Sequence, residues 1–320
     1  MLLFIILEFF AGCSSTKRDK NIIALYYSPK KFPYLYNEIR NRASKIVFRE
    51  NLKLIFRSVT DNIKDDISFI AKSGAFIVIL EDDKLSRIKK LYNSFRKKKI
   101  KVALITSEIT NTEYSDYLFT TDFSNIGRRT AEILYKSTRK RRNVFVMYLN
   151  KKKSRKQCEL VKGISSFFKE DKDILFYTNY YTGPDKFDKE DFHKLVHSFS
   201  GNLRGIFVDN DEYGVLLAKE LRMMKKDNKI KLASFGATIE GINSILKTEI
   251  AVSGDINRIS LYTNALKILI NVLKEKNINS KKIIYYDKGV CYTQVNIMDL
   301  LAKTKKYSIQ EILTAARKLQ

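Results

Sequence analysis

Short apolar runs alternate with segments of helical periodicity along almost the whole chain of 320 residues. The apolar runs are rich in Val, Ile, Phe and Tyr, as is typical of strands that are buried on both faces. The segments between them, such as 83–98, 125–137 and 211–225, have the period of amphipathic helices. This alternation, with right-handed crossovers, predicts parallel sheets covered by helices on both faces. The expected strands are 22–27, 52–57, 75–80, 102–106, 117–121, 144–149, 174–181, 205–208, 232–235, 250–254 and 282–287.

Eleven strands are too many for one doubly wound sheet in a chain of this length. The strands 102–106 and 117–121 are separated by a polar linker with no helical pattern, 107–116, which could carry the chain to a second sheet. We therefore expect an α/β fold with two doubly wound parallel-sheet lobes. Ligands of such sheets bind beyond the carboxyl ends of the strands, so two facing sheets would form a cleft lined by the residues that follow each strand.

The amino terminus has the pattern of a secretory signal that ends at a cysteine. Residues 1–12 read MLLFIILEFFAG, and the small residues Ala11 and Gly12 directly precede Cys13. This run is too short for a membrane span, which needs ~20 apolar residues, and suits a signal peptide. Its end resembles a lipobox, with Phe10 where leucine is usual. We expect residues 1–13 to be a lipoprotein signal with Cys13 lipidated; the alternative is a buried element with a chance cysteine.

The net charge of +25 raises the question of an anionic partner. Basic residues cluster at 96–101, 139–142 and 151–155. Such clusters suit nucleic acid or an anionic membrane, but they also suit solvated faces of a lysine-rich chain. They are spread along the chain and lack the interleaved aromatic residues on which bases stack. We therefore expect no specific nucleic-acid partner, although a lipid anchor would place this surface beside anionic head groups.

Motifs for catalysis or for cofactor binding are absent from the sequence, which has no GxSxG, P-loop, GxGxxG or CxxC pattern. His193 and His197 are one helical turn apart, but no third ligand stands near them to complete a metal site. Cys158 and Cys291 could form a disulfide or remain thiols. The sequence predicts a binding protein rather than an enzyme, with no cofactor.

Five segments, in order along the chain, resemble the type I periplasmic substrate-binding proteins of the ribose- and galactose-binding branch. The segments are IALYYSPKKFPYLYNEI, DFSNIGRRTAEIL, GIFVDNDEYGVLLAKEL, LASFGATIEGINSILKTEIAVSGD and YYDKGVCYTQVNIMDLL. The resemblance implies two lobes joined by a hinge of three crossings, near Thr121, Gly254 and Gly289, which close on a ligand. The implied first lobe is residues 21–120 with 255–288, and the second is 121–254 with 289–320.

The resemblance also implies ligand contacts, because sugar pockets use polar groups for hydroxyls and aromatic rings for C–H faces. Ser28, Tyr34, Asn210 and Phe235 match contact positions of the family. Each also has a structural interpretation; Asn210, for example, could cap the helix that follows it. Adding two residues that follow strands, the candidate ligand-binding residues are Ser28, Tyr34, Thr106, Tyr181, Asn210 and Phe235.

Several family positions are occupied by different residues in this chain. Thr106 and Gly236 replace carboxylates, Leu160 replaces an arginine, Gly254 replaces a glutamine, and Leu35 replaces a second aromatic residue. These changes argue against an ordinary ribose or galactose site and favour a sugar-like or nucleoside-like ligand, or a degenerate site.

The expected function is that of a solute-binding lipoprotein anchored in the cell envelope. It would face the periplasm or the exterior and deliver its ligand to the permease of an ABC importer. The alternative is a sensor with the same fold that signals to a membrane receptor kinase.

Overall fold

The computed structural model describes residues 22–27, 33–58, 60, 62–82, 84–107, 113–138, 143–152, 154–182, 187–199, 201–274 and 283–303. Cys13 and Ser28 lie outside the described residues, and so does the side chain of Tyr34. No helix in the described ranges is long and apolar enough to cross a membrane.

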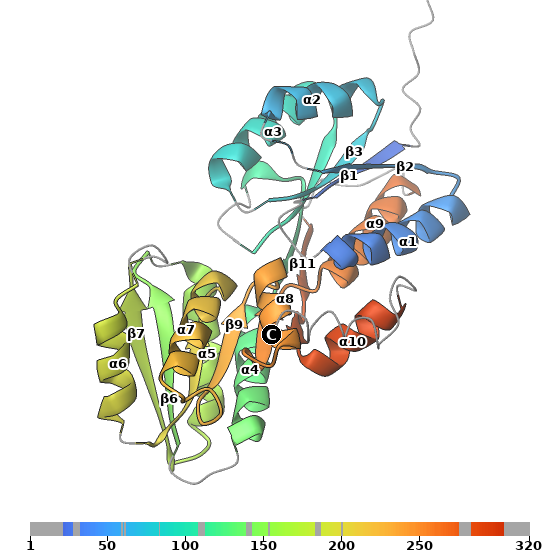
Figure 1. Cartoon of the computed structure of the whole chain (residues 1–320). Coiled ribbons are helices and arrows are strands. Elements are labelled where there is room, and N and C mark those ends of the chain that lie inside the picture. The colour runs from blue at the N-terminus through green and yellow to red at the C-terminus, as the bar shows by residue number, and fades with distance from the viewer. Residues whose placement is uncertain are drawn as a thin grey trace, which may run out of the picture.

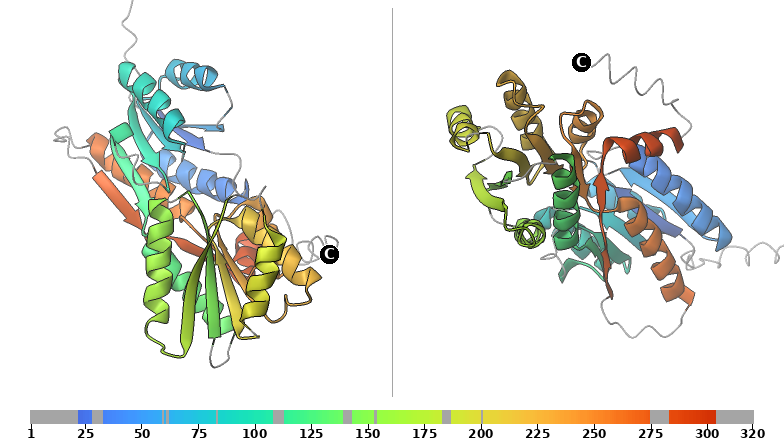
Figure 2. Two further views of the ribbon diagram at one scale, coloured as in Figure 1. Left: turned by 90° about the vertical axis from the view of Figure 1, so that its left-hand side faces the viewer. Right: turned by 90° about the horizontal axis from the view of Figure 1, so that it is seen from below.

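Two six-stranded sheets form two lobes, which Figures 1 and 2 show from three sides. The first sheet has the order β11-β5-β4-β3-β1-β2, and all its pairs are parallel. Its strands are β1 (Ile22–Tyr27), β2 (Lys53–Ser58), β3 (Ile77–Glu81), β4 (Lys101–Ile105), β5 (Tyr117–Thr121) and β11 (Ile283–Asp287).

The second sheet has the order β12-β10-β9-β8-β6-β7. Its strands are β6 (Asn143–Asn150), β7 (Ile174–Tyr181), β8 (Leu203–Val208), β9 (Lys231–Phe235), β10 (Val252–Asp255) and β12 (Val290–Tyr292). The strand β12 runs antiparallel to β10. The expectation of purely parallel sheets was therefore wrong for this edge strand, because a run of three residues is too short to show a strand pattern.

Helices cover both faces of the first sheet because alternate residues of its strands point to opposite faces. Ile23 and Leu25 of β1 join the cluster of α1 and α9, whereas Ala24 and Tyr26 join the cluster of α2 and α3. The helices of this lobe are α1 (Pro33–Arg49), α2 (Ile63–Lys72), α3 (Leu85–Lys97) and α9 (Arg258–Lys274). Those of the second lobe are α4 (Phe123–Thr138), α5 (Arg155–Phe168), α6 (Lys189–Ser198), α7 (Asp211–Met223), α8 (Ile239–Leu246) and α10 (Gln294–Lys303).

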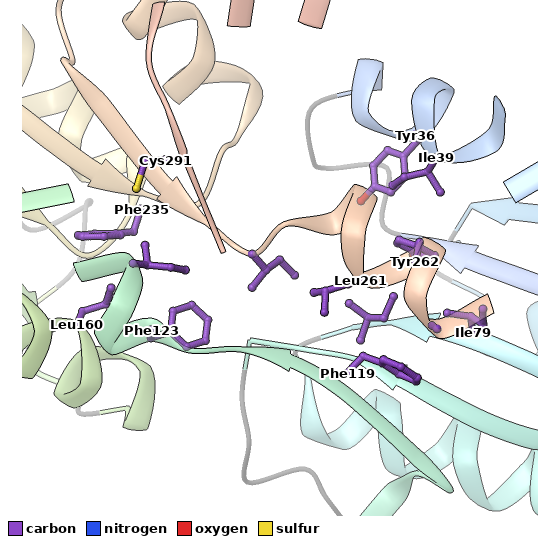
Figure 3. Packing of buried hydrophobic residues seen from close by; sticks show 14 of the residues in the cluster. Tyr36, Ile39, Ile79, Phe119, Phe123, Leu160, Phe235, Leu261, Tyr262 and Cys291 are labelled. Carbon is purple, nitrogen blue, oxygen red and sulfur yellow. The ribbon is translucent and has the colours of Figure 1, made fainter. Parts of the chain in front are cut away.

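The chain passes between the two sheets three times: from β5 to α4, from β10 to α9, and from β11 to β12. The strands β5 and β10 both end at a crossing. Because β4 and β11 run parallel to β5, and β9 runs parallel to β10, the carboxyl edges of both sheets lie at the crossings. Apolar side chains continue through this region, and Figure 3 shows Phe119 and Leu261 on one side and Phe123 and Phe235 on the other.

Two glycines at the crossings are required for different reasons. Gly289 has a φ of 70°, which L residues rarely adopt, and a Cβ atom there would lie 2.3 Å from Ile126. Gly254 has no positive φ, but its Cβ would lie 2.7 Å from the ring of Phe235. Gly289 thus provides backbone freedom, whereas Gly254 allows the close packing of β10.

Candidate functional site

A carboxylate with several hydrogen-bond donors lies at the carboxyl edge of the second sheet. Asp209 directly follows β8 and is 8% exposed. Its carboxylate accepts hydrogen bonds from the backbone N–H of Asn150 (2.8 Å), the hydroxyl of Tyr181 and the side-chain amide of Gln157. Because β8, β6 and β7 are neighbours in the sheet, their ends bring Asp209, Asn150 and Tyr181 together, and α5 supplies Gln157. We call Asp209, Tyr181, Asn210 and Gln157 the Asp209 cluster.

Asn210 has two roles within the Asp209 cluster. Its side-chain oxygen accepts from the backbone N–H of Tyr213 at 2.8 Å and so caps α7, as Asn commonly does. Its amide nitrogen donates to the hydroxyl of Tyr181 and to Asp209, the latter at 3.2 Å. The cap therefore occupies the oxygen alone, and the amide group remains directed into the cluster.

Tyr181 and Tyr213 form an aromatic pair beside the cluster, with ring centroids 3.8 Å apart and an interplanar angle of 13°. Burial raises the pKa of Tyr181 above its ordinary value, and the adjacent carboxylate of Asp209 raises this pKa further. The Tyr181 hydroxyl is therefore neutral at physiological pH and donates its proton to Asp209. The arrangement gathers a carboxylate, two amides, a phenol and aromatic rings within one short stretch of the sheet edge, and its polar groups hydrogen-bond to one another.

The second lobe is expected to lose stability at alkaline pH through Tyr213. Burial, followed by the charges of Asp188 and Asp209, raises the pKa of Tyr213 from 10.0 to about 12. A folded-state pKa above the unfolded value means that the stabilisation is complete below pH 10 and is lost as the pH rises towards about 12. Thermal unfolding monitored by circular dichroism should show the Tm falling over this interval, and falling less in Tyr213→Phe. Tyr286→Phe, which changes an exposed ring, is the matched control; an equal pH slope in all three proteins would contradict the prediction.

A buried ion-pair cluster lies at the hinge. Arg258, the first residue of α9, donates to Glu81 at the end of β3 at 2.6 Å and also pairs with Asp255 of β10. The hydroxyls of Tyr36 and Tyr262 donate to the other oxygen of Glu81 at 2.8 and 3.1 Å. Burial alone would lower the pKa of Arg258, but the facing carboxylate of Glu81 raises it, so the guanidinium stays charged.

This hinge cluster joins the two sheets directly, since Glu81 belongs to the first sheet and Asp255 to the second. Arg258 and Glu81 are 2% and 5% exposed. Glu81 follows the pattern of a polar residue at a strand end, yet the guanidinium and the two tyrosine hydroxyls already occupy both of its oxygens. Its carboxylate is therefore used for the hinge and is not free for a ligand.

The six candidate ligand-binding residues fall into three groups in the structure. Tyr181 and Asn210 lie together in the Asp209 cluster. Thr106 and Phe235 are each 1% exposed; Phe235 packs in the apolar core, and the carbonyl of Thr106 accepts from the hydroxyl of Thr120 at 2.9 Å. The third group, Ser28 and the side chain of Tyr34, is outside the described residues, so contact by these residues stays a prediction.

Two residues of these clusters, Gln157 and Arg258, were not predicted from the sequence. Gln157 belongs to a capping box with Ser154, and the pattern Ser-x-x-Gln before a helix is a recognisable sequence signal. Arg258 has no comparable signal, because its partner Glu81 is 177 residues away along the chain.

The departures from the family pattern have structural correlates. Leu35, in place of an aromatic residue, is fully buried in the apolar cluster that contains Tyr292 and Ile297. Leu160, in place of an arginine, is fully buried, and its backbone lies against Gly127 of α4. Gly236 has a φ of 145°, a conformation that an L residue such as aspartate rarely adopts. Each position is thus adapted to packing or backbone geometry in this chain.

Comparison with known proteins identifies the fold. No family model and no curated protein matches the chain. The arabinose-binding protein AraP from Geobacillus stearothermophilus superposes with a TM-score of 0.70 at 13% identity, over 88% of this chain and 99% of that one. A mutant of the XylFII–LytSN complex gives a TM-score of 0.68 at 15% identity, over 87% and 99%. A periplasmic solute-binding protein of an ABC transporter from Actinobacillus succinogenes 130z with bound D-allose gives 0.62 at 14% identity, over 88% and 100%.

The chain therefore has the two-lobed α/β fold of the type I periplasmic sugar-binding proteins. This confirms the fold expected from the sequence. The similar structures include a galactofuranose binding protein and a putative LacI transcriptional regulator from Bacteroides fragilis.

Proposed function

We propose that this chain is an envelope-anchored solute-binding lipoprotein of an ABC importer. It binds a sugar-like or nucleoside-like molecule between the lobes. The observation that carries the proposal is the Asp209 cluster at the carboxyl edge of the second sheet, where ligands of parallel sheets bind. A ligand with several hydroxyl or ring N–H groups would take over hydrogen bonds that the carboxylate, amide and phenol of the cluster make to one another in this structure.

The anchor and the permease are parts of the same proposal. The signal-like residues 1–12 and Cys13 support a lipid anchor. The first strand begins at Ile22, so only a short segment separates this anchor from the first lobe. The proposed first lobe, 21–120 with 255–288, would then lie close to the membrane. The similarity to the D-allose complex supports an importer role, because that protein of the same fold is a solute-binding protein of an ABC transporter.

A sensor function is the second candidate. It is supported by the similarity to the XylFII–LytSN complex, in which a protein of this fold is paired with a second component. An adjacent gene for a permease and an ATPase would favour the importer, whereas an adjacent histidine kinase gene would favour the sensor. A degenerate binding protein is the third candidate, and it is supported by the engagement of Glu81 in the hinge and by the burial of Thr106 and Phe235.

A thermal-shift screen of pentoses, hexoses and nucleosides on the chain lacking residues 1–13 tests the proposal. A ligand at a hundred times its Kd stabilises the folded state by about 2.7 kcal/mol, which raises the Tm measurably. Asn210→Ser keeps a capping hydroxyl for α7 but removes the amide, so we expect about tenfold weaker binding and a lower Tm of the unliganded protein, because Tyr181 and Asp209 lose a donor. Asn243→Ser, at an exposed position of α8, is the control. The proposal fails if no compound raises the Tm, or if both variants bind as the parent does.

A further inference from the structure

A cavity lies at the edge of the second sheet opposite the Asp209 cluster, where the strands begin. Its volume is about 330 Å³, within the size range of small-molecule sites. It is lined by the end of α4, the starts of β8 and β9, and the turn that follows α7. Since the Asp209 cluster lies at the carboxyl edge, this cavity is separate from the candidate site described above.

The lining of this cavity is basic. Among the described residues that line it are Arg204, Lys226, Lys229 and Lys231, and none of those residues is Asp or Glu. Three of these side chains, Arg204, Lys226 and Lys231, are half-buried. Within the described part of the chain, none of the four forms an ion pair, and the Nε of Arg204 is buried without a hydrogen-bond partner. We call the cavity lined by these four residues the cationic cavity.

A neighbouring cavity shows that such a lining is not general at this edge. That cavity shares Lys231 but also contains Asp227 and Glu249, and Glu249 forms an ion pair with Arg222. Another half-buried cation, Arg87, pairs with both Asp66 and Asp82. The cationic cavity therefore differs from its surroundings in gathering positive charge without a protein counter-charge.

Helix ends offset only part of this charge. The helices α4, α6 and α7 end at this edge, and a helix C-terminus carries about half a negative charge. At α4 the hydroxyls of Ser137 and Thr138 already donate to the carbonyls of Leu134 and Tyr135. Three such ends together balance about one and a half charges against four cations, so an excess of positive charge remains. Partly desolvated, unpaired cations are unfavourable unless an anion completes the site.

We propose that the cationic cavity binds a soluble small molecule that bears a diphosphate or triphosphate group. Several negative charges on adjacent oxygens match several cations around one small volume, and the guanidinium of Arg204 can donate to two phosphate oxygens at once. The unpartnered Nε of Arg204 is the donor that such a group would satisfy. This site does not depend on the interlobe ligand, so it holds or fails independently of the proposed function.

Titration calorimetry of the full chain in detergent, with inorganic pyrophosphate as the probe, tests the site. We expect saturable binding of pyrophosphate in physiological salt. Arg204→Gln with Lys231→Gln removes two of the charge-assisted contacts and should weaken this binding at least about tenfold. Lys219→Gln with Lys267→Gln removes the same charge from exposed positions of α7 and α9 and should leave the affinity within about twofold.

Two further measurements keep the test decisive. The unliganded Tm of the Arg204→Gln, Lys231→Gln variant should equal or exceed that of the parent, because unpaired cations are removed. If this variant does not fold, Lys229→Gln at an exposed position replaces it and should weaken pyrophosphate binding. The proposal is overturned by the absence of pyrophosphate binding or by equal weakening in the control variant. Binding to phosphatidylglycerol vesicles without binding to pyrophosphate would also overturn the proposal, because the bound anion would then be a lipid head group.

Discussion

Arg258→Leu is expected to lower the free energy of unfolding by about 3–5 kcal/mol, because it leaves two buried carboxylates without their counter-charge. Glu81 and Asp255 are 5% and 4% exposed, and both pair with Arg258. Solvent cannot compensate for the lost guanidinium at such a site. The loss should be measured by urea unfolding at neutral pH.

Two variants separate the buried pair from a general charge effect. Arg128 forms an exposed pair with Glu170, so Arg128→Leu should change stability by less than about 1 kcal/mol. Adding Glu81→Gln to Arg258→Leu should recover part of the loss, because one unpaired charge is then removed. If Arg258→Leu proved as mild as Arg128→Leu, the hinge cluster would not hold the two sheets in the way described.

Asp211→Ala is expected to lower the free energy of unfolding by about 3 kcal/mol or more, since several buried donors would lose their acceptor. Asp211 is 1% exposed at the start of α7. One oxygen accepts from the hydroxyls of Ser234 and Ser253 at 2.5 and 2.8 Å, and the other accepts from the backbone N–H of Thr238 at 2.7 Å. A single carboxylate thus connects α7, β9, β10 and the start of α8.

The neighbouring acidic residue provides the control for this prediction. Glu212 is exposed in the same first turn of α7, so Glu212→Ala should change stability by no more than about 0.5 kcal/mol. Chemical unfolding with a common m-value for all variants would make the comparison direct. A loss under about 1 kcal/mol for Asp211→Ala would show that the serine and threonine groups find other partners.

The strands and most helices could be predicted from the sequence because buried parallel strands form near-continuous apolar runs. The runs at 22–27, 117–121 and 174–181 coincide with β1, β5 and β7. The exception, β12, has only three residues and is defined by its pairing with β10 rather than by its own pattern. Local periodicity cannot reveal a strand whose existence depends on a distant partner.

The candidate site could be predicted less completely than the fold. The position of Asn210 after a strand and before a helix places it at the sheet edge, where the structure has it. Whether a strand-end residue faces a cleft or the core depends on packing that the local sequence does not encode, and Thr106 and Phe235 are buried for that reason. The engagement of Glu81 by Arg258 likewise arises only from the tertiary arrangement.

Binding of a ligand between the two lobes is the central claim, and lobe closure, followed as a distance between spin labels, tests it most directly. In the chain lacking residues 1–13, Cys158 on α5 is exposed and Cys291 is buried, so Cys158 can be labelled selectively. Lys90→Cys adds a second label at an exposed position of α3 in the first lobe. A ligand from the thermal-shift screen should shift the distance distribution between α3 and α5 to shorter values. A distribution that stays unchanged at saturating ligand would contradict the account.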